Sequence, residues 1–385
     1  MMYQVLTLAD DLTGALEVGA KFAASGLSSL VTTRRSIPAG PDQETAVLVI
    51  DTETRHMAPE LARERVLELS RAGFNRDIPY VYKKTDSTLR GNIASEIRGV
   101  MEGYPDLPLL YVPAYPAMNR TVREGILHVD GVPVNETDFA EDPLNAVRTA
   151  NIPRLFSDAG LHSVVSTTPA ELKTSPQTAI YVCDATSESD LEVAARKFLQ
   201  TSRFRLAAGP AGFVGHLAPL LDVPRTAPAT MPVVKRALVV NGSFNEVSVR
   251  QISYARAHGF SSIMANGTAA EAEQPGWVIL NHEFDTCEPL VYARRLSRSV
   301  CGALREEEFD AVVVFGGDTA YAIVEALGHP EIRPIGEVLE GVPISAIGRK
   351  AAGLKGEGPF YLISKAGGFG PVDVLRLIHT NLTRG

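Results

Sequence analysis

The sequence predicts an α/β protein of two domains, each with a largely parallel sheet flanked by helices. Short apolar runs of strand length alternate with amphipathic stretches along the chain, which is typical of parallel sheets with crossover helices. The 385 residues are enough for two such cores. The proline-rich stretch LDVPRTAPATMPVVKR at 221–236 interrupts the alternation. We therefore expect domains at 1–222 and 237–385, joined by a linker at 223–236.

The expected strands are short, mostly apolar segments bounded by turn residues. In the first domain they are 4–9, 29–33, 46–51, 80–84, 109–113, 162–167, 179–184 and 206–209. In the second domain they are 237–242, 277–281, 311–316 and 360–365. Helical patterns lie between many of them, at 59–73, 88–102, 188–200, 245–258, 289–305 and 318–327. Residues 114–160 lack a clear period, and loops of that length in a compact domain are more often functional than idle.

Composition and charge exclude several classes of protein. The net charge is −8, from 37 basic and 45 acidic residues without a basic run, which argues against nucleic-acid binding. The longest apolar runs are strand-sized and the N-terminus lacks a basic signal-peptide region, so no membrane association is expected. Cys183, Cys287 and Cys301 lie far apart in the sequence, so a disulfide framework and a zinc site are both disfavoured. We expect a soluble cytoplasmic protein in a reducing compartment.

Polar side chains follow four predicted strands of the first domain. In open parallel sheets, ligands bind beyond the carboxyl ends of the strands. These residues are Asp10, Asp11 and Thr13 after the first strand; Asp51, Thr54 and Arg55 after the third; Lys84, Thr85, Asp86, Ser87, Thr88 and Arg90 after the fourth; and Asn119 and Arg120 after the fifth. Carboxylates accept hydrogen bonds from sugar hydroxyls and arginine binds carboxylates bidentately, so this edge suits a polyhydroxylated acid.

Each of these residues also has a purely structural interpretation. Asp11 or Thr13 could cap one helix, and Ser87 or Thr88 the next. Arg90, at a predicted helix start, could pair with Glu96 or bond to loop carbonyls. Side chains alternate along a strand, so Lys83 should point away from Lys84 and have a structural role. The recurrence of polar residues after four strands favours the binding interpretation for the edge as a whole.

Three glycine turns connect strands to helices in the second domain. They occur in VVNGSFNE at 239–246, VVVFGGDTA at 312–320 and YLISKAGGFG at 361–370. Glycines before a helix let backbone N–H groups approach a phosphate, and the helix dipole favours the anion. Three such turns predict a site for nucleotide phosphates. Neither GxxxxGK[ST] nor GxGxxG after a first strand is present, so a P-loop NTPase and an ordinary dinucleotide-binding fold are both disfavoured.

The motifs ADDLTGA, KKTDSTLRGN, NGSFNEVSVRQI, GGDTA and KAGGFG resemble, in this order, those of the four-carbon acid sugar kinase family. The resemblance extends from Ala9 to Gly370. The family contains threonate, erythronate and 3-oxo-tetronate kinases, so the resemblance implies an ATP-dependent kinase that phosphorylates the C4 hydroxyl of a tetronate. It also implies that the N-terminal domain binds the acid sugar and the C-terminal domain binds ATP.

The resemblance and the polar strand ends together assign candidate site residues. Those expected to bind substrate are Asp10, Asp11, Arg55, Lys84, Thr85, Asp86, Ser87 and Arg90. Those expected to bind ATP are Ser243, Gly316, Gly317, Asp318, Thr319, Gly367 and Gly368. The chain departs from the family where Phe244 and Asn245 follow Ser243, in place of Cys-Ser, and where Asn119 stands in place of a glycine. These departures leave the exact substrate open.

Phosphoryl transfer needs positioning, charge stabilisation and an acceptor for the hydroxyl proton. The candidate proton acceptors are Asp11, Asp86 and Asp318, of which Asp86 or Asp11 is favoured. Lys84 and Arg90 are the cations expected to meet the substrate carboxylate or the transferring phosphoryl group. Mg²⁺ is expected to bridge the β- and γ-phosphates, with ligands that the sequence does not identify. We expect the active site in the interdomain cleft, with closure excluding water.

Two alternatives to a tetronate kinase stay open at this point. One is a kinase of another small hydroxy acid, and the other is a non-catalytic sensor of acid sugars or nucleotides. A sensor would be expected to lose a glycine turn or an acidic candidate, yet all are present. The expected partners are a small acid sugar and ATP, without nucleic acid or membrane. The sequence does not identify the epimer, nor decide whether the chain forms a homo-oligomer.

Overall fold

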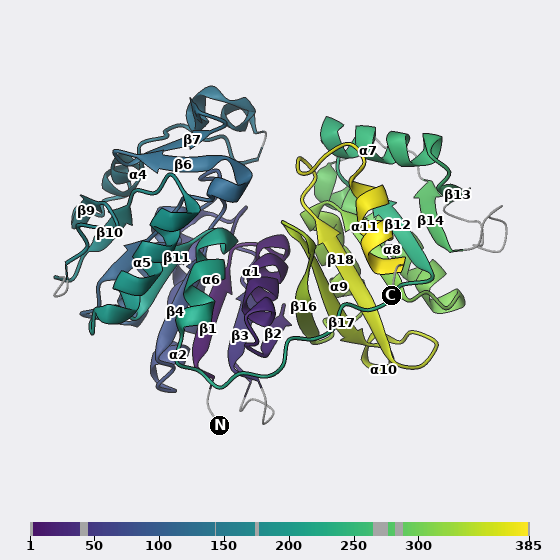
Figure 1. The fold of residues 1–385 in the computed structure, drawn as a ribbon, viewed down its shortest axis with the longest axis horizontal. Helices are drawn as coiled ribbons and strands as arrows, with labels where there is room; N and C mark the ends of the chain where they lie inside the picture. The colour runs from purple at the N-terminus through teal and green to yellow at the C-terminus, as the bar shows by residue number, and fades with distance from the viewer. Residues whose placement is uncertain are drawn as a thin grey trace. The chain divides into compact units, whose positions relative to one another are not determined.

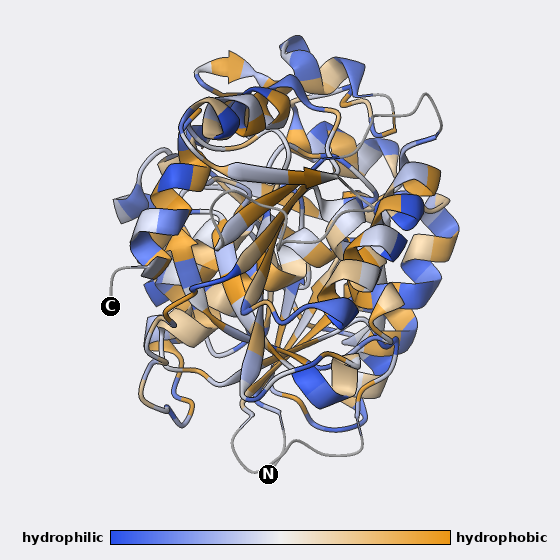
Figure 2. Cartoon of the chain, turned by 90° about the vertical axis from the view of Figure 1, so that its right-hand side faces the viewer, coloured by the Kyte–Doolittle hydropathy of each residue, from blue (hydrophilic) through white to orange (hydrophobic). Residues whose placement is uncertain are grey.

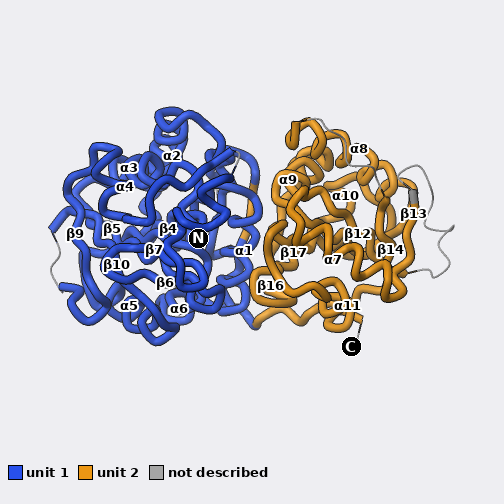
Figure 3. The backbone as a smooth tube through the Cα atoms, turned by 90° about the horizontal axis from the view of Figure 1, so that it is seen from above, with its two compact units in different colours: residues 1–29, 33–227 blue, residues 30–32, 228–385 orange. Residues whose placement is uncertain are grey.

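The computed structural model describes residues 3–38, 45–142, 144–173, 177–264, 276–281 and 288–383, so Cys287 lies outside the described residues. The chain divides into two compact units (Figure 3). Unit 1 comprises Met1–Ser29 and Thr33–Ala227, and unit 2 comprises Leu30–Thr32 and Pro228–Gly385. The division after Ala227 falls inside the stretch expected as a linker. The segment Leu30–Thr32, which we expected in the first domain, belongs to unit 2.

Unit 1 is built on a parallel sheet with the strand order β3-β1-β4-β11-β5-β10-β9. The strands are β1 (Val5–Ala9), β3 (Val47–Asp51), β4 (Tyr80–Lys84), β5 (Leu109–Tyr111), β9 (Val164–Thr167), β10 (Ile180–Cys183) and β11 (Leu206–Gly209). Most are buried along their whole length, as continuous apolar runs in a parallel sheet require. The predicted α/β class is confirmed.

Helices cover this sheet in two groups (Figure 1). The helices are α1 (Leu12–Ala24), α2 (Pro59–Phe74), α3 (Ile93–Gly103), α4 (Ile152–Asp158), α5 (Glu188–Gln200) and α6 (Ala211–Leu217), with the 3₁₀ turn η4 (Ala218–Leu220). α1 and α5 pack beside α6, and α2 packs on α3. Figure 2, which colours the whole chain by hydropathy, shows strands with many orange residues and helices in which blue and orange residues alternate, the pattern of strands buried between amphipathic helices.

Residues 114–160 are more regular than expected. The strands β6 (Arg120–Arg123), β7 (Ile126–Val129) and β8 (Val132–Pro133) form a separate antiparallel sheet. The 3₁₀ turns η1 (Pro116–Met118), η2 (Val134–Glu136) and η3 (Asp138–Glu141) flank it. Both hairpin loops have two residues at positive φ, Glu124-Gly125 and Asp130-Gly131. The prediction of long loops was wrong here because these tight turns, a recognisable hairpin signal, join strands too short for a clear alternation.

Unit 2 has a mixed sheet with the order β13-β14-β12-β15-β18-β17-β16-β2. Its parallel strands are β13 (Ser261–Met264), β14 (Trp277–Asn281), β12 (Ala237–Asn241), β15 (Ala311–Phe315) and β18 (Pro359–Lys365). The strands β17 (Val342–Gly348), β16 (Ile332–Leu339) and β2 (Ser29–Thr32) continue it antiparallel. The sequence did not predict β16, because Pro334 and Gly336 interrupt its pattern where its register with β17 shifts.

The described part of unit 2 contains five helices. They are α7 (Glu246–Ala257), α8 (Pro289–Glu306), α9 (Gly317–Ala326), α10 (Arg349–Ala352) and α11 (Val374–Thr383). α8 packs on α9, and α7 packs on α11. Between α7, α11 and the sheet lies a core that includes Trp277, Phe315 and Ile378. Among the described helices of both units, none is long and apolar enough to span a membrane.

Candidate functional site

The parallel register of unit 1 brings the polar strand ends together. Ala9 at the end of β1 lies beside Asp51 of β3 and Lys84 of β4. Asp10 and Asp11 directly follow Ala9, and the chain after Asp51 leads to Arg55 within four residues. The expected clustering at the carboxyl edge of this sheet is therefore present for the first, third and fourth strands.

Arg55 is the centre of this edge. Its Nε lies 2.7 Å from Asp10 Oδ2 and its Nη1 lies 2.7 Å from Asp11 Oδ2. Its Nη2 lies 3.6 Å from Asp86 Oδ2. Burial by itself would lower the pKa of Arg55, but the three carboxylates outweigh it and raise that pKa well above its usual value. We call Asp10, Asp11, Arg55, Asp86 and Arg90 the Arg55 cluster.

Asp86 is held by cations and donors on both carboxylate oxygens. Its Oδ1 accepts hydrogen bonds from the backbone N–H of Thr88 at 2.9 Å and from Arg90 Nε at 3.2 Å. Its Oδ2 pairs with Arg90 Nη2 at 2.8 Å. Burial raises the pKa of Asp86, but Arg90 and Arg55 lower it more, so it lies well below the usual range. A carboxylate so occupied orients the two arginines and is a weak proton acceptor.

The loop before α3 corrects two expectations. Leu89 has φ 63° and Gly91 has φ 84°, so the chain is not helical there and α3 begins only at Ile93, not at residue 88. Ser87 and Thr88 are therefore not its caps. Arg90 pairs with Asp86 and, at 3.4 Å, with Asp142, and its guanidinium lies over the Phe139 ring. The alternative pairing of Arg90 with Glu96 was wrong.

Lys83 and Lys84 point to opposite sides of β4, as the alternation predicted. Lys83 Nζ lies 3.1 Å from Glu96 Oε2 of α3, and both side chains are fully buried. Lys84 Nζ lies 3.9 Å from Glu17 of α1 and donates to the Thr85 carbonyl at 2.9 Å. A β-carbon on Gly14 would come within 2.7 Å of Lys84 Nζ, so the glycine makes room for this cation.

Asp11 has both roles that the sequence left open. Its Oδ1 accepts the backbone N–H of Gly14 at 2.8 Å and caps α1, while its Oδ2 pairs with Arg55. Its side chain retains 20% exposure, against 2% for Asp10. Burial raises the pKa of Asp10, but Arg55, Lys83 and Lys84 together lower it further, so Asp10 is held as an anion.

Several buried oxygens at this edge lack a partner among the described residues. They are Asp10 Oδ1, Thr13 Oγ1, Asp51 Oδ2 and Thr85 Oγ1. A buried oxygen without a hydrogen bond costs about 1–3 kcal/mol. Burial, followed by the charge of Glu53, raises the pKa of Asp51 well above its usual value. Such oxygens are suited to accept hydrogen bonds from a hydroxylated ligand or from water.

The remaining candidates of unit 1 lie around the Arg55 cluster. Thr85 is buried and its N–H donates to the Gly209 carbonyl at 3.0 Å, and Ser87 is half-buried in the following loop. Thr54 bonds to Glu96. Asn119 is exposed before β6, and Arg120 donates to the Met118 carbonyl. No ion pair or hydrogen bond between Arg120 and the Arg55 cluster is found in the described part of the chain.

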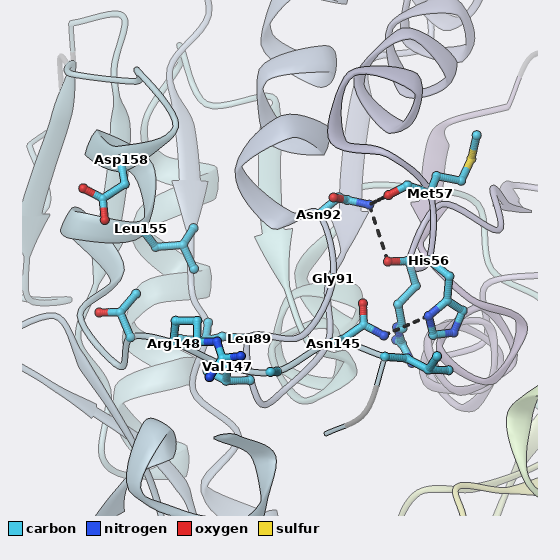
Figure 4. Close-up of a pocket in the computed structure, with 14 residues that line it drawn as sticks. His56, Met57, Leu89, Gly91, Asn92, Asn145, Val147, Arg148, Leu155 and Asp158 are labelled. Carbon is cyan, nitrogen blue, oxygen red and sulfur yellow. Dashed lines mark hydrogen bonds between the residues drawn. The ribbon is translucent and has the colours of Figure 1, made fainter. Parts of the chain in front are cut away.

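A cavity of about 420 Å³ adjoins the Arg55 cluster (Figure 4). Its lining includes Arg55, His56, Asn92, Asn145 and Arg148. The Asn92 amide nitrogen donates to the carbonyls of Thr54 at 2.8 Å and Met57 at 2.9 Å, and so fixes the chain after β3. Asn145 Nδ2 lies 2.8 Å from His56 Nδ1, which ties the segment after η3 to this wall. The cavity shares Arg55 with the cluster.

In unit 2 the three glycine turns follow neighbouring parallel strands. Asn241, Phe315 and Lys365 lie side by side at the ends of β12, β15 and β18. A β-carbon on Gly242 would lie 1.8 Å from Thr319 Oγ1, and one on Gly367 would lie 2.0 Å from Ser243 Oγ. The turns therefore touch one another, and glycine is required where they do.

The predicted nucleotide residues gather at this edge of unit 2. Gly316 has φ 115° and lies against Ser243, while Gly368 lies against Asn245. Gly317 and Asp318 begin α9, with Asp318 exposed in its first turn. Asn245 caps α7 by accepting the Val247 N–H at 2.9 Å. Two helix N-termini and three glycine turns thus adjoin, an arrangement suited to phosphate groups.

Two residues of this edge were not among the sequence-based candidates. Lys365 Nζ is buried and donates to three carbonyls of the turn that follows it. Gln251 of α7 donates to three carbonyls of the same turn. The motif KAGGFG contained the lysine, but only the fold brings Gln251 to it. Among the described residues, no group of three or more histidine, cysteine, aspartate or glutamate side chains could hold a metal ion.

Two protein-family models match this chain, one in each unit. A family model described as a sugar-binding N-terminal domain matches residues 5–217, and one described as a nucleotide-binding C-terminal domain matches residues 291–375. The chain is 31% identical to a D-threonate kinase of Bordetella bronchiseptica, over 96% of this chain and 95% of the relative. It is 27% identical to a D-erythronate kinase of Heliobacterium modesticaldum (97% and 95% covered) and 26% identical to a 3-oxo-tetronate kinase of Methylobacterium radiotolerans (95% and 96%).

Solved structures share the fold. A Salmonella typhimurium protein superposes with a TM-score of 0.79 at 19% identity, covering 99% of this chain and 98% of its own. A Bordetella bronchiseptica protein, crystallised as a domain-swapped dimer with bound citrate, superposes with a TM-score of 0.50 at 25% identity, covering 99% and 98%.

Proposed function

This chain belongs to the four-carbon acid sugar kinase family and is an ATP-dependent phosphotransferase that acts on a hydroxyl group; we propose that its acceptor is the C4 hydroxyl of a tetronate such as threonate, erythronate or 3-oxo-tetronate. We assign acid-sugar binding to unit 1 and ATP binding to unit 2. The descriptions of the two matching family models support this division. The non-catalytic sensor loses its support, because the curated relatives are kinases.

The observation that carries the proposal is the set of buried oxygens without partners beside Arg55. Asp10 Oδ1 and Asp51 Oδ2 lie on neighbouring strand ends, where Asp10 Oδ1 can accept a hydrogen bond from a substrate hydroxyl and Asp51 Oδ2 can accept one or, when protonated, donate one. Lys84 and Arg90 are cations at the same edge and are suited to the substrate carboxylate. A small anionic polyol meets both requirements at once.

The proton acceptor that we favour is Asp11. Asp86 has both oxygens engaged by arginines and Thr88, and its pKa is held low. Asp11 also has both oxygens engaged, by the Gly14 N–H and by Arg55, but it meets one arginine where Asp86 meets two, and its 20% exposure against 7% for Asp86 lets it approach a bound hydroxyl. Asp318, exposed at the start of α9, lies on the nucleotide side and is suited to a metal-bound water.

Mg²⁺ fits this arrangement without a dedicated protein cage. The ion keeps several waters and is commonly held by one or two carboxylates with the substrate phosphates, so Asp318 alone is a sufficient protein contact. When bound, it would neutralise charge on the β- and γ-phosphates. The glycine turns and Ser243 would orient those phosphates through backbone N–H groups and the hydroxyl.

Two further expectations stay predictions. One is an active site between two domains that close on the substrates. The other is a homo-oligomer, which the domain-swapped dimer of the Bordetella structure supports.

The decisive experiment is ADP release from Mg-ATP against D- and L-threonate, D- and L-erythronate, 3-oxo-tetronate and C5 aldonates. We expect acid-dependent turnover with at least one C4 compound. Turnover with C5 acids and none with C4 acids would overturn the tetronate assignment and favour a kinase of another hydroxy acid. The product's phosphate position, determined by ³¹P–¹H correlation, tests the C4 assignment separately.

A further inference from the structure

Lys365 ends β18 and is enclosed by its own turn. The residue is 1% exposed. Its Nζ donates to the carbonyls of Ala366 and Phe369, both at 2.6 Å, and of Gly367 at 3.3 Å. It also lies 4.8 Å from the centre of the Phe315 ring. No carboxylate among the described residues lies within ion-pair distance of Lys365, so its charge is balanced only by carbonyl dipoles and the ring.

Gln251 completes the set of donors beneath the turn. Its Nε2 lies 2.9 Å from the carbonyls of Phe369 and Gly370 and 3.0 Å from that of Pro371. Gln251 belongs to α7, and the residue is 1% exposed. One lysine and one glutamine thus bind five carbonyls in a turn of six residues, 366–371.

The direction of these carbonyls determines the direction of the N–H groups. A trans peptide unit is planar, and its C=O and N–H point opposite ways. With the carbonyls of Ala366, Gly367 and Phe369 turned inward to Lys365, the N–H groups of Gly367, Gly368 and Gly370 are turned outward. Successive outward N–H groups form an anion-binding concavity, and a buried cation beneath them strengthens it.

We propose that Lys365 and Gln251 are positioning residues that hold the turn 366–371 as an anion site for nucleotide phosphates, and that the turn binds phosphate more tightly while Lys365 carries its proton. This inference rests on the proposed nucleotide site in unit 2. The neighbouring side chains support it, because Ser243 Oγ lies 2.0 Å from the position of a β-carbon on Gly367, and Gly316 lies against Ser243. Lys365 acts through the turn and does not itself touch the phosphate.

The charge of this lysine is adjustable near neutral pH. Burial lowers the pKa of Lys365 to about 7. An anion bound on the turn would raise that pKa, so nucleotide binding should take up a proton above neutral pH. Affinity should then fall with rising pH, by about tenfold for each pKa unit by which the nucleotide raises the pKa of the lysine. Phe315 of β15 faces Lys365, and Gln251 of α7 binds the same Phe369 carbonyl; neither of them titrates. Two other elements pack on β18: β17 has no titratable side chain, and α9 carries the acidic Asp318 in its first turn.

The test is calorimetry of ADP binding to the full chain at pH 6.5 to 9, in paired buffers of different ionisation enthalpy. The paired buffers give the number of protons taken up on binding. In the wild type we expect an uptake between zero and one, largest near pH 8. Subtracting the curve of Lys365→Met removes the titration of ADP itself, which both proteins share.

Three variants separate charge from structure. Lys365→Met should bind ADP at least tenfold more weakly at pH 6.5 and show no excess proton uptake. Lys365→Arg, which stays charged, should bind with an affinity that changes between pH 7 and 9 only as the titration of ADP itself requires. Gln251→Leu should weaken binding but keep the proton uptake, because the lysine is retained.

Two results would count against different claims. ADP binding to the wild type with no more proton uptake than Lys365→Met would overturn the role of Lys365 while leaving the nucleotide site intact. Should Lys365→Met fail to fold, a wild-type affinity as independent of pH as that of Lys365→Arg would overturn it equally. Absence of ADP binding at every pH would instead contradict the proposed nucleotide site.

Discussion

Lys83 and Glu96 form an ion pair of 3.1 Å in which neither side chain reaches solvent. Glu96 also accepts a hydrogen bond from Thr54, and Lys83 donates to the Lys84 carbonyl at 2.7 Å. The pair therefore joins α3 to β4 and to the segment that carries Arg55. Removing one partner leaves an uncompensated buried charge, which commonly costs about 3–5 kcal/mol.

We predict that Lys83→Met lowers the free energy of unfolding by about 3–5 kcal/mol, while the double variant Lys83→Met/Glu96→Leu recovers most of the loss. Urea denaturation measures both. The matched control is Arg196→Met, since the exposed Arg196–Glu192 pair should be worth less than about 1 kcal/mol. Equal losses in the single and double variants would contradict this account of the pair.

Gly14 leaves space for Lys84, and its replacement should displace that lysine. A β-carbon there would lie 2.7 Å from Lys84 Nζ and 2.8 Å from Asp11 Oδ1. We predict that Gly14→Ala raises the KM for the acid sugar about tenfold, equivalent to the loss of about 1.4 kcal/mol of binding, and leaves the KM for ATP unchanged. Gly215→Ala in α6 is the control, because its nearest neighbour is 3.7 Å away. Steady-state kinetics with each substrate varied will show whether the effect is confined to the acid.

Gly242 has the same relation to Thr319 in unit 2. A β-carbon would lie 1.8 Å from Thr319 Oγ1, so Gly242→Ala must move the first turn of α9 or the Ser243 turn. We predict a rise of about tenfold or more in the KM for ATP, with no change in the KM for the acid sugar. Gly302→Ala, in α8 with open space around its β-carbon, should instead stabilise the protein by up to about 1 kcal/mol. An unchanged affinity for ATP in Gly242→Ala would argue against a nucleotide site at this turn.

Asp51 gives a pH dependence of known sign. Its pKa is raised in the folded protein, so the folded state binds its proton more tightly than the unfolded state. The stability linked to Asp51 is therefore fully present below its ordinary pKa of 3.8 and is lost as the pH rises towards the raised folded value. We predict that Asp51→Asn unfolds at a higher temperature than the wild type at pH 7, and that the difference disappears below about pH 4.

Asp86 should give the opposite dependence. Its pKa is lowered, so its contribution is present above the ordinary value of 3.8 and is lost as the pH falls through the lower folded value. We predict that Asp86→Asn is less stable than the wild type at pH 7 and that the two proteins converge in strong acid. Parallel thermal denaturation of Asp51→Asn and Asp86→Asn from pH 3 to 8 checks both signs together. If the unfolding temperatures of both variants differed from that of the wild type in the same direction at pH 7, the direction assigned to one of the two pKa shifts would be wrong.

The sequence predicted the strand ends of unit 1 well because a parallel sheet leaves little freedom there. Once β1, β3 and β4 are recognised, their parallel register places Ala9, Asp51 and Lys84 together. The loop before α3 was harder to predict from the sequence. Its helix begins at Ile93 because Leu89 takes a left-handed conformation that the sequence pattern does not reveal. Arg90 was assigned the wrong alternative partner for a related reason, since Asp142 lies 52 residues away in a segment expected to be irregular.

In unit 2, the glycine turns were recognisable individually and their contact was not. Gly367 meets Ser243 only because β12 and β18 both flank β15, an order that depends on the tertiary fold. Gln251 looked like an ordinary helical residue. Its role appears when α7 is placed over the turn after β18, where it binds three carbonyls. The strand β16 was not predicted, because Pro334 and Gly336 interrupt its sequence pattern.

The assignment of Leu30–Thr32 to unit 2 has a consequence for the order of events on the ribosome. Val31 pairs with Ile332, so this strand, which is synthesised early, can form that pairing only after about 300 further residues have been synthesised. Until β16 emerges, that short segment has no sheet partner from unit 2, although the chain on either side of it can already fold into unit 1. A fragment that begins at Pro228 should therefore lack Leu30–Thr32, and its strand β16 would lose the antiparallel neighbour that Val31 provides.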